Sequence, residues 1–145
     1  MFYPKEREWG LMRTFVYWML QLTWGLPLNV IGAIFALLLI CLGKKPKRFG
    51  YAVYFELGNH WGGLNLGGFF FVQKNADKRL KSHEYGHSFQ TLLLGPLMPF
   101  LVTIPSAVRY HYRSYRRAKG HSLSPYDAFW CEGWATRLGV KYLKD

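Results

Sequence analysis

The feature that most constrains the fold of this chain is an apolar stretch, residues 14–43, that contains no charged side chain. A continuous helix of this length would be about 45 Å long, whereas the hydrocarbon core of a bilayer is only about 30 Å thick. Gly25 and Pro27 stand near the middle of the stretch. The pattern therefore predicts an N-terminal membrane segment, either one kinked and tilted span or two short helices that enter the bilayer and return.

Basic residues follow apolar segments, and this placement narrows the class of partner. The chain of 145 residues has a formal net charge of +11, from 19 Lys and Arg against 8 Asp and Glu. Basic residues gather at 44–48, directly after the first apolar stretch, and at 109–119, directly after a second one. Such placement is typical of contact with anionic lipid headgroups. No motif of a nucleic-acid-binding domain accompanies the charge, so we expect a lipid bilayer as partner and no nucleic acid.

The second uncharged stretch, residues 88–108, has enough residues for a helix that crosses a bilayer, but it carries Pro96, Pro99 and Pro105. Basic residues flank it on both sides. Because positive charge marks the cytoplasmic flank, a segment with positive charge at both ends should return to the side that it left or lie buried in protein. We therefore expect a re-entrant, interfacial or buried segment rather than a span.

Two segments between the apolar stretches, residues 51–57 and 69–73, are rich in aromatic and β-branched side chains. They bracket a glycine-rich stretch. This composition predicts a β-hairpin with a long loop. Because the remaining segments predict helices, the expected fold class is mainly α with a small β-hairpin or sheet, an α+β fold that follows the membrane segment.

Two helices of the second half are marked by residues that favour helix ends. The first is expected to begin with Asn75 as its N-cap and to end at Gly95 and Pro96. The second is expected to begin with Ser124 as its N-cap and Pro125 at its first position.

The two cysteines offer no disulfide framework. Cys41 lies inside the first apolar stretch and Cys131 lies on the second predicted helix. They form no C-x-x-C pair, and burial or a reducing compartment accounts for both.

The first predicted helix contains the sequence HEYGH at residues 83–87. On a helix of 3.6 residues per turn, His83 and His87 project from the same face, so both imidazoles can reach one Zn²⁺ ion. Glu84 directly follows the first histidine, which places its carboxylate beside the metal, where it can accept a proton from a water molecule. The motif therefore predicts a zinc site with Glu84 as general base.

A catalytic zinc site usually has three protein ligands and one open position, so a third ligand is needed. The metzincin pattern would require glycine and histidine where Gln90 and Leu93 stand, and that class is excluded. Glu132 on the second predicted helix is the expected third ligand. His111 and His121 remain alternatives.

Four short segments carry a resemblance to a known family: HEYGHSFQ at residues 83–90, GPL at 95–97, IPS at 104–106 and CEGWATRLG at 131–139. They resemble a family of small bacterial membrane-associated proteins similar to zinc metallopeptidases. In that family HEYGH-x-x-Q precedes GP, a PS turn and an E-x-W-A-D-x-L-G helix. The resemblance covers residues 81–139. It implies a zincin-like fold with Glu84 as base and with zinc on His83, His87 and Glu132.

The chain departs from the family pattern at Thr136, where the family more often has an aspartate. A carboxylate at that position can orient a histidine that binds zinc. Asp127, the nearest acidic residue upstream of Glu132, lies toward the other end of the predicted helix. The sequence therefore does not identify the side chain that would orient the zinc-binding histidines.

Zincins also hold an extended substrate by hydrogen bonds to a strand beside the metal, and residues 69–73 precede the motif helix in the order that this role requires. A plain core strand is the alternative. A donor that stabilises the reacting oxygen is expected as well, and the side chains able to act in this way are His111, Tyr112, His121 and Tyr126.

The sequence thus predicts a membrane-associated zinc metallohydrolase, a peptidase that acts on a protein or peptide near the bilayer. The alternative is a non-catalytic membrane protein or adaptor with a structural zinc site. We expect residues 1–48 to form the membrane segment with its basic stop, and residues 49–145 to form the zincin-like metal-binding domain. The predicted location is the bacterial inner membrane, with the metal site on the cytoplasmic side.

Overall fold

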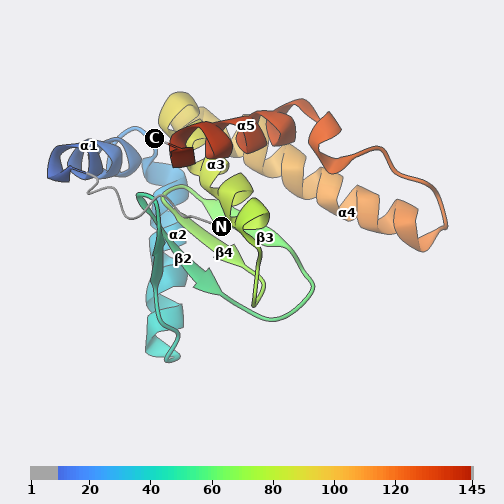
Figure 1. Ribbon diagram of the computed structural model, residues 1–145, viewed down its shortest axis with the longest axis horizontal. Helices are drawn as coiled ribbons and strands as arrows, with labels where there is room; N and C mark the ends of the chain where they lie inside the picture. Colours follow the sequence, from blue (N-terminus) through green and yellow to red (C-terminus); the bar gives the residue numbers. More distant parts are fainter. Residues whose placement is uncertain (1–9, 145) are drawn as a thin grey trace.

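The computed structural model describes residues 10–144 and shows a mainly helical protein with one small mixed sheet (Figure 1). The helices are α1 (Leu11–Leu22), α2 (Leu26–Cys41), α3 (Lys78–Leu94), α4 (Ile104–Ala118) and α5 (Trp130–Lys144). The strands are β1 (Lys47–Phe49), β2 (Ala52–Glu56), β3 (Gly63–Leu66) and β4 (Phe69–Val72). The expected combination of helices with a small sheet is confirmed.

The N-terminal apolar stretch forms two helices, α1 and α2, whose axes are bent by 102° at the break between them. Pro27 lies in the first turn of α2, where its missing N–H breaks no helical hydrogen bond, so the new helix can begin there. Among the described residues, no single helix is both long and apolar enough to cross a bilayer. The α1–α2 pair reaches that length and apolarity only as a bent pair.

The second uncharged stretch also bends. After α3 the chain passes through a 3-10 turn, η1 (Gly95–Leu97), and a π-helical turn, η2 (Pro99–Thr103), before α4 begins. The segments Lys78–Leu97 and Pro99–Ala118 meet at 117°. They too satisfy the criteria for a membrane span only as a bent pair, and the re-entrant or interfacial placement stays a prediction.

The sheet has the strand order β1-β2-β4-β3, and this topology corrects the predicted hairpin. Residues 51–57 and 69–73 supply β2 and β4, which pair in parallel and so cannot form a hairpin with each other. The glycine-rich stretch between them contains β3, which pairs with β4 in antiparallel fashion. A two-residue turn joins them, and Gly67 adopts the positive φ of 76° that such a turn favours.

The sheet lies between α2 on one face and α3 on the other, so its central strand β4 is buried on both sides (Figure 1). Phe70 packs in a cluster with Tyr85 of α3 and Tyr17 of α1. Phe71 packs in a second cluster with Leu28 of α2. Both clusters combine residues from before and after position 48, and the domain boundary predicted there stays a prediction.

The motif helix begins two residues later than predicted. Asp77 is the N-cap of α3 and its Oδ1 accepts a hydrogen bond of 2.9 Å from the backbone N–H of Leu80. Asn75, the predicted cap, instead has a φ of 58° and lies in the preceding turn. The predicted end is confirmed, because α3 stops at Leu94 and Gly95 follows in the left-handed region.

The helix predicted to start at Ser124 begins at Trp130 instead. Pro125 precedes a short 3-10 turn, η3 (Tyr126–Ala128). Phe129 then has an extended backbone, with ψ of 134°, which separates this turn from α5. The two cysteines are both free, and the expected burial holds for Cys131 but not for Cys41, which is exposed.

Candidate metal centre

Helix α3 is the central helix of the molecule, and every residue of 82–91 is buried. His83, Glu84 and His87 lie within this buried stretch. Burying polar side chains is costly unless each has a partner. The surroundings of the HEYGH motif must therefore supply partners for its imidazoles and its carboxylate.

Helices α3 and α5 are packed so closely that two glycines form the contact. A Cβ atom built on Gly86 would lie 1.8 Å from the backbone oxygen of Ala135, and one on Gly139 would lie 1.8 Å from that of Ser82. No side chain larger than hydrogen fits at either position without moving the helices apart. Gly86 therefore allows α5 to approach α3 closely.

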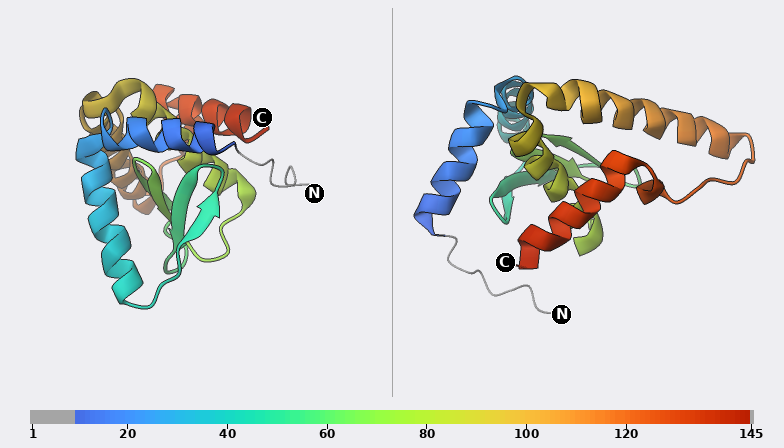
Figure 2. Two further views of the ribbon diagram at one scale, coloured as in Figure 1. Left: turned by 90° about the vertical axis from the view of Figure 1, so that its left-hand side faces the viewer. Right: turned by 90° about the horizontal axis from the view of Figure 1, so that it is seen from above.

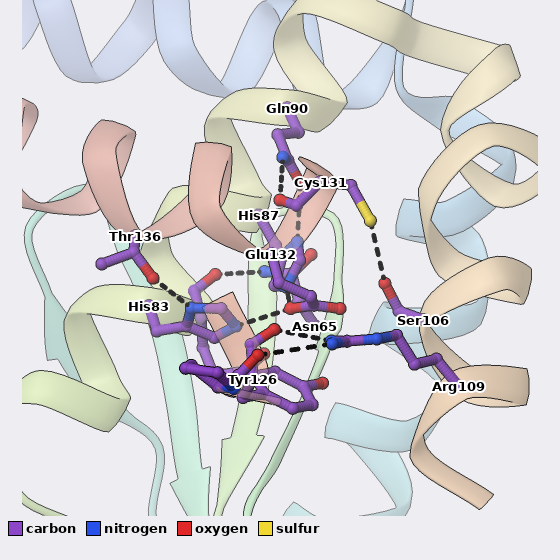
Figure 3. Close-up of polar contacts among 12 residues, drawn as sticks. Asn65, His83, His87, Gln90, Ser106, Arg109, Tyr126, Cys131, Glu132 and Thr136 are labelled. Carbon is purple, nitrogen blue, oxygen red and sulfur yellow. Dashed lines mark hydrogen bonds and ion pairs between the residues drawn. The ribbon is translucent and has the colours of Figure 1, made fainter. Parts of the chain in front are cut away.

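This close packing brings Glu132 of α5 to the two motif histidines (Figure 3). Oε2 of Glu132 lies 2.9 Å from Nε2 of His83 and 3.3 Å from Nε2 of His87. The possible ligand atoms of the three residues all lie within 4.8 Å of one another. The alternative ligands His111 and His121 do not belong to this group.

The three residues fit a metal cation. Glu132 is fully buried, and its second oxygen, Oε1, has no hydrogen-bond partner in the part of the chain that the structure describes. A buried carboxylate oxygen without a partner is unfavourable, and a cation would satisfy it. Burial opposes ionisation of Glu132, but hydrogen bonds from His83 and His87 outweigh it and hold the pKa of this carboxyl well below its usual range. The group is therefore a carboxylate with two imidazoles, a donor set that divalent transition metals accept.

Each histidine has a further partner on its other ring nitrogen. Nδ1 of His83 lies 2.8 Å from Oγ1 of Thr136, and Nδ1 of His87 lies 2.6 Å from Oε1 of Gln90. Gln90 also donates from Nε2 to the backbone oxygen of Cys131, at 2.8 Å. When Nε2 of a histidine binds a cation, Nδ1 holds the proton and can donate it to such an oxygen. These contacts fix both rings with Nε2 turned toward Glu132.

Thr136 thus occupies the position that the family pattern gives to aspartate, and its hydroxyl supplies the contact to His83. Gln90 plays the same part for His87, and the sequence reasoning missed this contact. Its position one helical turn after His87 was the available signal, because residues three apart on a helix lie on the same face.

Glu84 lies beside the three-residue group but is not part of it. Its carboxylate is packed against β3, where a Cβ atom on Gly63 would come within 2.7 Å of Oε1. Burial raises the pKa of Glu84, and the neighbouring His87 and His83 oppose this shift. Asn65 of β3 holds the same turn of α3, because its Nδ2 donates to the backbone oxygen of Glu84 at 2.9 Å. No spacing rule in the sequence pointed to Gly63 or Asn65.

Two cavities open beside the three-residue group, one of about 230 Å³ and one of about 350 Å³. Glu84, Gly63, Tyr110 and Tyr126 line both of them. The smaller cavity also reaches His87 and Glu132 and has mainly apolar walls, formed by Trp61, Leu64, Met98, Val102 and Ala107. The larger cavity reaches His83, Thr136 and Arg79. Space for a second molecule therefore exists on both sides of Glu84.

The four side chains predicted as donors have different positions. Tyr126 lines both cavities and its ring lies 5.9 Å from that of His83, between ring centroids. His111 lines the smaller cavity. Tyr112 and His121 are exposed and line neither cavity. Of the four, Tyr126 and His111 thus line cavities beside the motif.

The strand predicted to hold a substrate, residues 69–73, is the interior strand β4 and pairs with β2 and β3. Its backbone groups are used within the sheet, so of the two alternatives the plain core strand is confirmed and the substrate strand is wrong. The strand beside Glu84 is β3, which stands at the edge of the described sheet and places Gly63 and Asn65 in the wall of the smaller cavity. An edge strand has backbone groups that can pair with an added extended chain.

Comparison of the chain with protein-family models, with curated proteins and with solved structures finds no significant match. The family resemblance drawn from the short segments stays a prediction. The functional assignment therefore rests on the geometry of the site.

Proposed function

We propose that the protein is a membrane-associated, zinc-dependent metallohydrolase, and that it is a peptidase. The observation that supports this most is the relation between the buried group of His83, His87 and Glu132 and the adjoining cavities. Three protein ligands leave one position open for water or substrate. Glu84 borders the same cavities and is not a member of the ligand group.

Each residue has a defined task in this proposal. His83, His87 and Glu132 would hold the metal, which supplies Lewis-acid chemistry to activate water and polarise a carbonyl group. Glu84 would accept the proton of the attacking water and later deliver it to the leaving amine. Burial raises the pKa of Glu84, which favours a carboxyl group that can both accept and return a proton. Tyr126 would donate a hydrogen bond to the reacting oxygen.

The edge strand β3 would bind the substrate. An extended peptide that pairs with β3 would pass Glu84, because Gly63 is in contact with that carboxylate. A residue of the substrate would then enter the smaller cavity, whose walls are mainly apolar. Backbone pairing along a strand suits a protein or peptide substrate better than a compact small molecule.

Zinc is the metal proposed, because two histidines and one glutamate are the ligand set of one class of catalytic zinc sites. The two contacts to Nδ1, from Thr136 and from Gln90, support the same assignment, since such contacts hold imidazoles in the orientation for a metal.

The membrane association rests on exposed apolar side chains. On α2, the residues Val30, Ile31, Ile34, Phe35, Leu37 and Leu38 are exposed by 46% or more. Their number and clustering exceed what a water-facing helix normally shows. The basic residues at 44–48 directly follow α2 and favour contact with anionic headgroups on the cytoplasmic side of the bacterial inner membrane.

Glu84→Gln tests the peptidase proposal. The full chain is purified in detergent, zinc content is measured, and a mixture of fluorogenic peptides serves as substrate. We expect the variant to keep its zinc and to lose cleavage by about 10²-fold or more, because the amide cannot accept the proton. His83→Ala is the matched comparison and should lose both zinc and cleavage.

Two outcomes would contradict the proposal. Cleavage by Glu84→Gln at the rate of the parent would exclude Glu84 as the base. A zinc-bound structure with four protein ligands and no open position would point to the structural zinc site of a non-catalytic membrane adaptor.

A further inference from the structure

Helix α4 projects from the body of the molecule and has two chemically different faces (Figure 1). No residue of α4 is buried. One face, which we call the inner face, carries Arg109, Tyr110 and Arg113 and contacts the rest of the chain. The opposite face, which we call the outer face, carries Ile104, Val108, Tyr112 and Tyr115. A helix without a buried face is stabilised by its few polar contacts with the rest of the chain and by any molecule that binds its apolar face.

The inner face holds the segment that connects α4 to α5, residues 119–129, which we call the Tyr126 loop. Nη1 of Arg109 donates to the backbone oxygen of Tyr126 at 2.6 Å, and Nη1 of Arg113 donates to that of Ser124 at 2.8 Å. The guanidinium of Arg109 also lies over the rings of Tyr126 and Phe129, at 5.2 and 4.9 Å from their centroids. The position of Tyr126 beside His83 therefore depends on α4.

Tyr110 links the same face to the other wall of the smaller cavity. Its hydroxyl donates to the backbone oxygen of Trp61 at 3.1 Å. Ser106, Ala107, Tyr110 and His111 of α4 all line that cavity. One wall of the candidate active site is thus made by a helix whose opposite face is more than half exposed.

The outer face carries apolar and aromatic side chains from Ile104 to Tyr115. Ile104, Val108, Tyr112 and Tyr115 are exposed by 52%, 63%, 57% and 61%. Their spacing of three or four residues places them in one row along a helix. Leu97 and Phe100 precede the row and are exposed by 53% and 70%. An exposed apolar row of this length is typical of a surface that binds a membrane or another protein.

The basic side chains beside the outer face, and the location of α4 relative to α2, favour a bilayer with anionic headgroups as the partner of this face. The guanidinium of Arg116 lies 6.0 Å from the ring centroid of Tyr112, and Nζ of Lys119 lies 5.7 Å from that of Tyr115. Basic groups next to tyrosine rings match the level of lipid headgroups. Seen from above, α4 runs lengthwise along the same side of the molecule as α2, which is seen end-on (Figure 2, right). Both helices therefore lie on one side of the molecule, as contact with one bilayer surface requires.

We infer that the outer face of α4 binds an anionic bilayer surface, and that this binding orders the Tyr126 loop over the candidate metal site. A surface that binds only the ordered helix stabilises every contact that depends on that helix. Lipid contact on the outer face and loop contact on the inner face are then coupled, and the coupling is reciprocal. The catalytic consequence, a site completed only at the membrane, rests on the proposed function.

The first experiment tests the lipid contact. Val108→Cys is made in the full chain together with Cys41→Ala, labelled with a fluorophore, and placed in nanodiscs that contain phosphatidylglycerol and a nitroxide-labelled lipid. We expect strong loss of fluorescence. Val140→Cys is the matched control, because Val140 is a similarly apolar, 43% exposed residue on α5, and it should keep its fluorescence.

A different cover would be detected with the same variant before it is labelled. Cross-linking between two copies through the free thiol at position 108, together with no quenching by the lipid after labelling, would show that a second copy covers the outer face and would overturn the inference.

The second experiment tests the coupling without using catalysis. Backbone hydrogen exchange of residues 119–129 is measured in nanodiscs of phosphatidylcholine with or without phosphatidylglycerol. We expect several-fold slower exchange with the anionic lipid, and Val108→Asp should abolish this slowing while Val140→Asp keeps it. Equal exchange in both lipids for the parent chain would overturn the coupling. If the loop is protected as expected but no peptide is cleaved, the peptidase proposal fails and the coupling stands.

Discussion

Oγ1 of Thr136 lies 2.8 Å from Nδ1 of His83, on the side of the imidazole that faces away from Glu132. A hydroxyl group therefore stands where the resembling family more often has a carboxylate. The hydroxyl can accept the Nδ1 proton, but it does not add negative charge to the histidine. The contact therefore orients the ring without placing a second carboxylate beside it.

Thr136→Val should weaken metal binding without changing the shape of the site. Valine has nearly the same volume as threonine but offers no acceptor, so Nδ1 of His83 loses its partner. Loss of such a contact typically costs about 10- to 100-fold in metal affinity. Competition with a fluorescent zinc chelator measures the change. Thr136→Ser keeps the hydroxyl and should bind zinc nearly as well as the parent. Equal affinity of the valine and serine variants would show that the contact does not support the metal.

Gln90 supports the second histidine and also joins the two helices of the site. Its Oε1 faces Nδ1 of His87, and its Nε2 donates to the backbone oxygen of Cys131, next to Glu132. Gln90→Leu removes both contacts and leaves a buried carbonyl oxygen without its donor. We expect a lower free energy of unfolding, by about 1 to 3 kcal/mol, together with weaker zinc binding.

Gln90→Glu separates the effect of the contact with His87 from the effect of the contact with Cys131. The carboxylate still accepts from His87 but cannot donate to the oxygen of Cys131. Urea unfolding in detergent and zinc competition should therefore show loss of stability with most of the zinc affinity retained. A glutamate variant that loses zinc as strongly as the leucine variant would mean that the link to Cys131, and not the histidine contact, positions the metal site.

The histidines of the candidate metal site could be predicted from the sequence because their geometry is local. Positions 83, 84 and 87 lie on one helix, and the spacing alone sets the directions of their side chains. Glu132 was reached by the requirement for a third ligand, although its helix begins at Trp130 and not at the predicted cap. The extended backbone of Phe129 ends the turn that Pro125 starts, and sequence preferences for caps do not reveal such an interruption.

The sheet could not be predicted in the same way, because strand pairing depends on contacts between distant segments. The aromatic segments that form β2 and β4 were visible, but the short β3 was hidden in a stretch rich in glycine. Without β3, the sequence leaves two interpretations of residues 69–73, a strand that holds a substrate or a plain core strand. Once β3 pairs with β4, the edge strand brings Gly63 and Asn65 to Glu84, and no motif marked these residues.

Gly86→Ala should separate the helices that form the site. The added methyl group would meet the backbone oxygen of Ala135, which cannot rotate away as a side chain could. Overpacking of this kind typically costs about 1 to 3 kcal/mol, and the shift of α5 would draw Glu132 away from the histidines. We expect a lower melting temperature and less bound zinc. Gly10→Ala is the control, since nothing lies within 4 Å of a Cβ atom there, and it should leave both measurements unchanged. A fully stable Gly86→Ala variant would contradict the close packing of α3 and α5.

Gly63→Ala should disturb the base without disturbing the metal. The new Cβ atom would come within 2.7 Å of Oε1 of Glu84, and its three nearest atoms all belong to the Glu84 side chain. The carboxylate must turn away from β3, and a misplaced base lowers kcat. We expect zinc content equal to that of the parent and kcat lower by about 10-fold or more. Adding Glu84→Asp shortens the side chain and relieves the crowding, so the double variant should lose less than the product of the two single losses. Strictly multiplicative losses would mean that Gly63 acts through another route, such as the pairing of an extended substrate with β3.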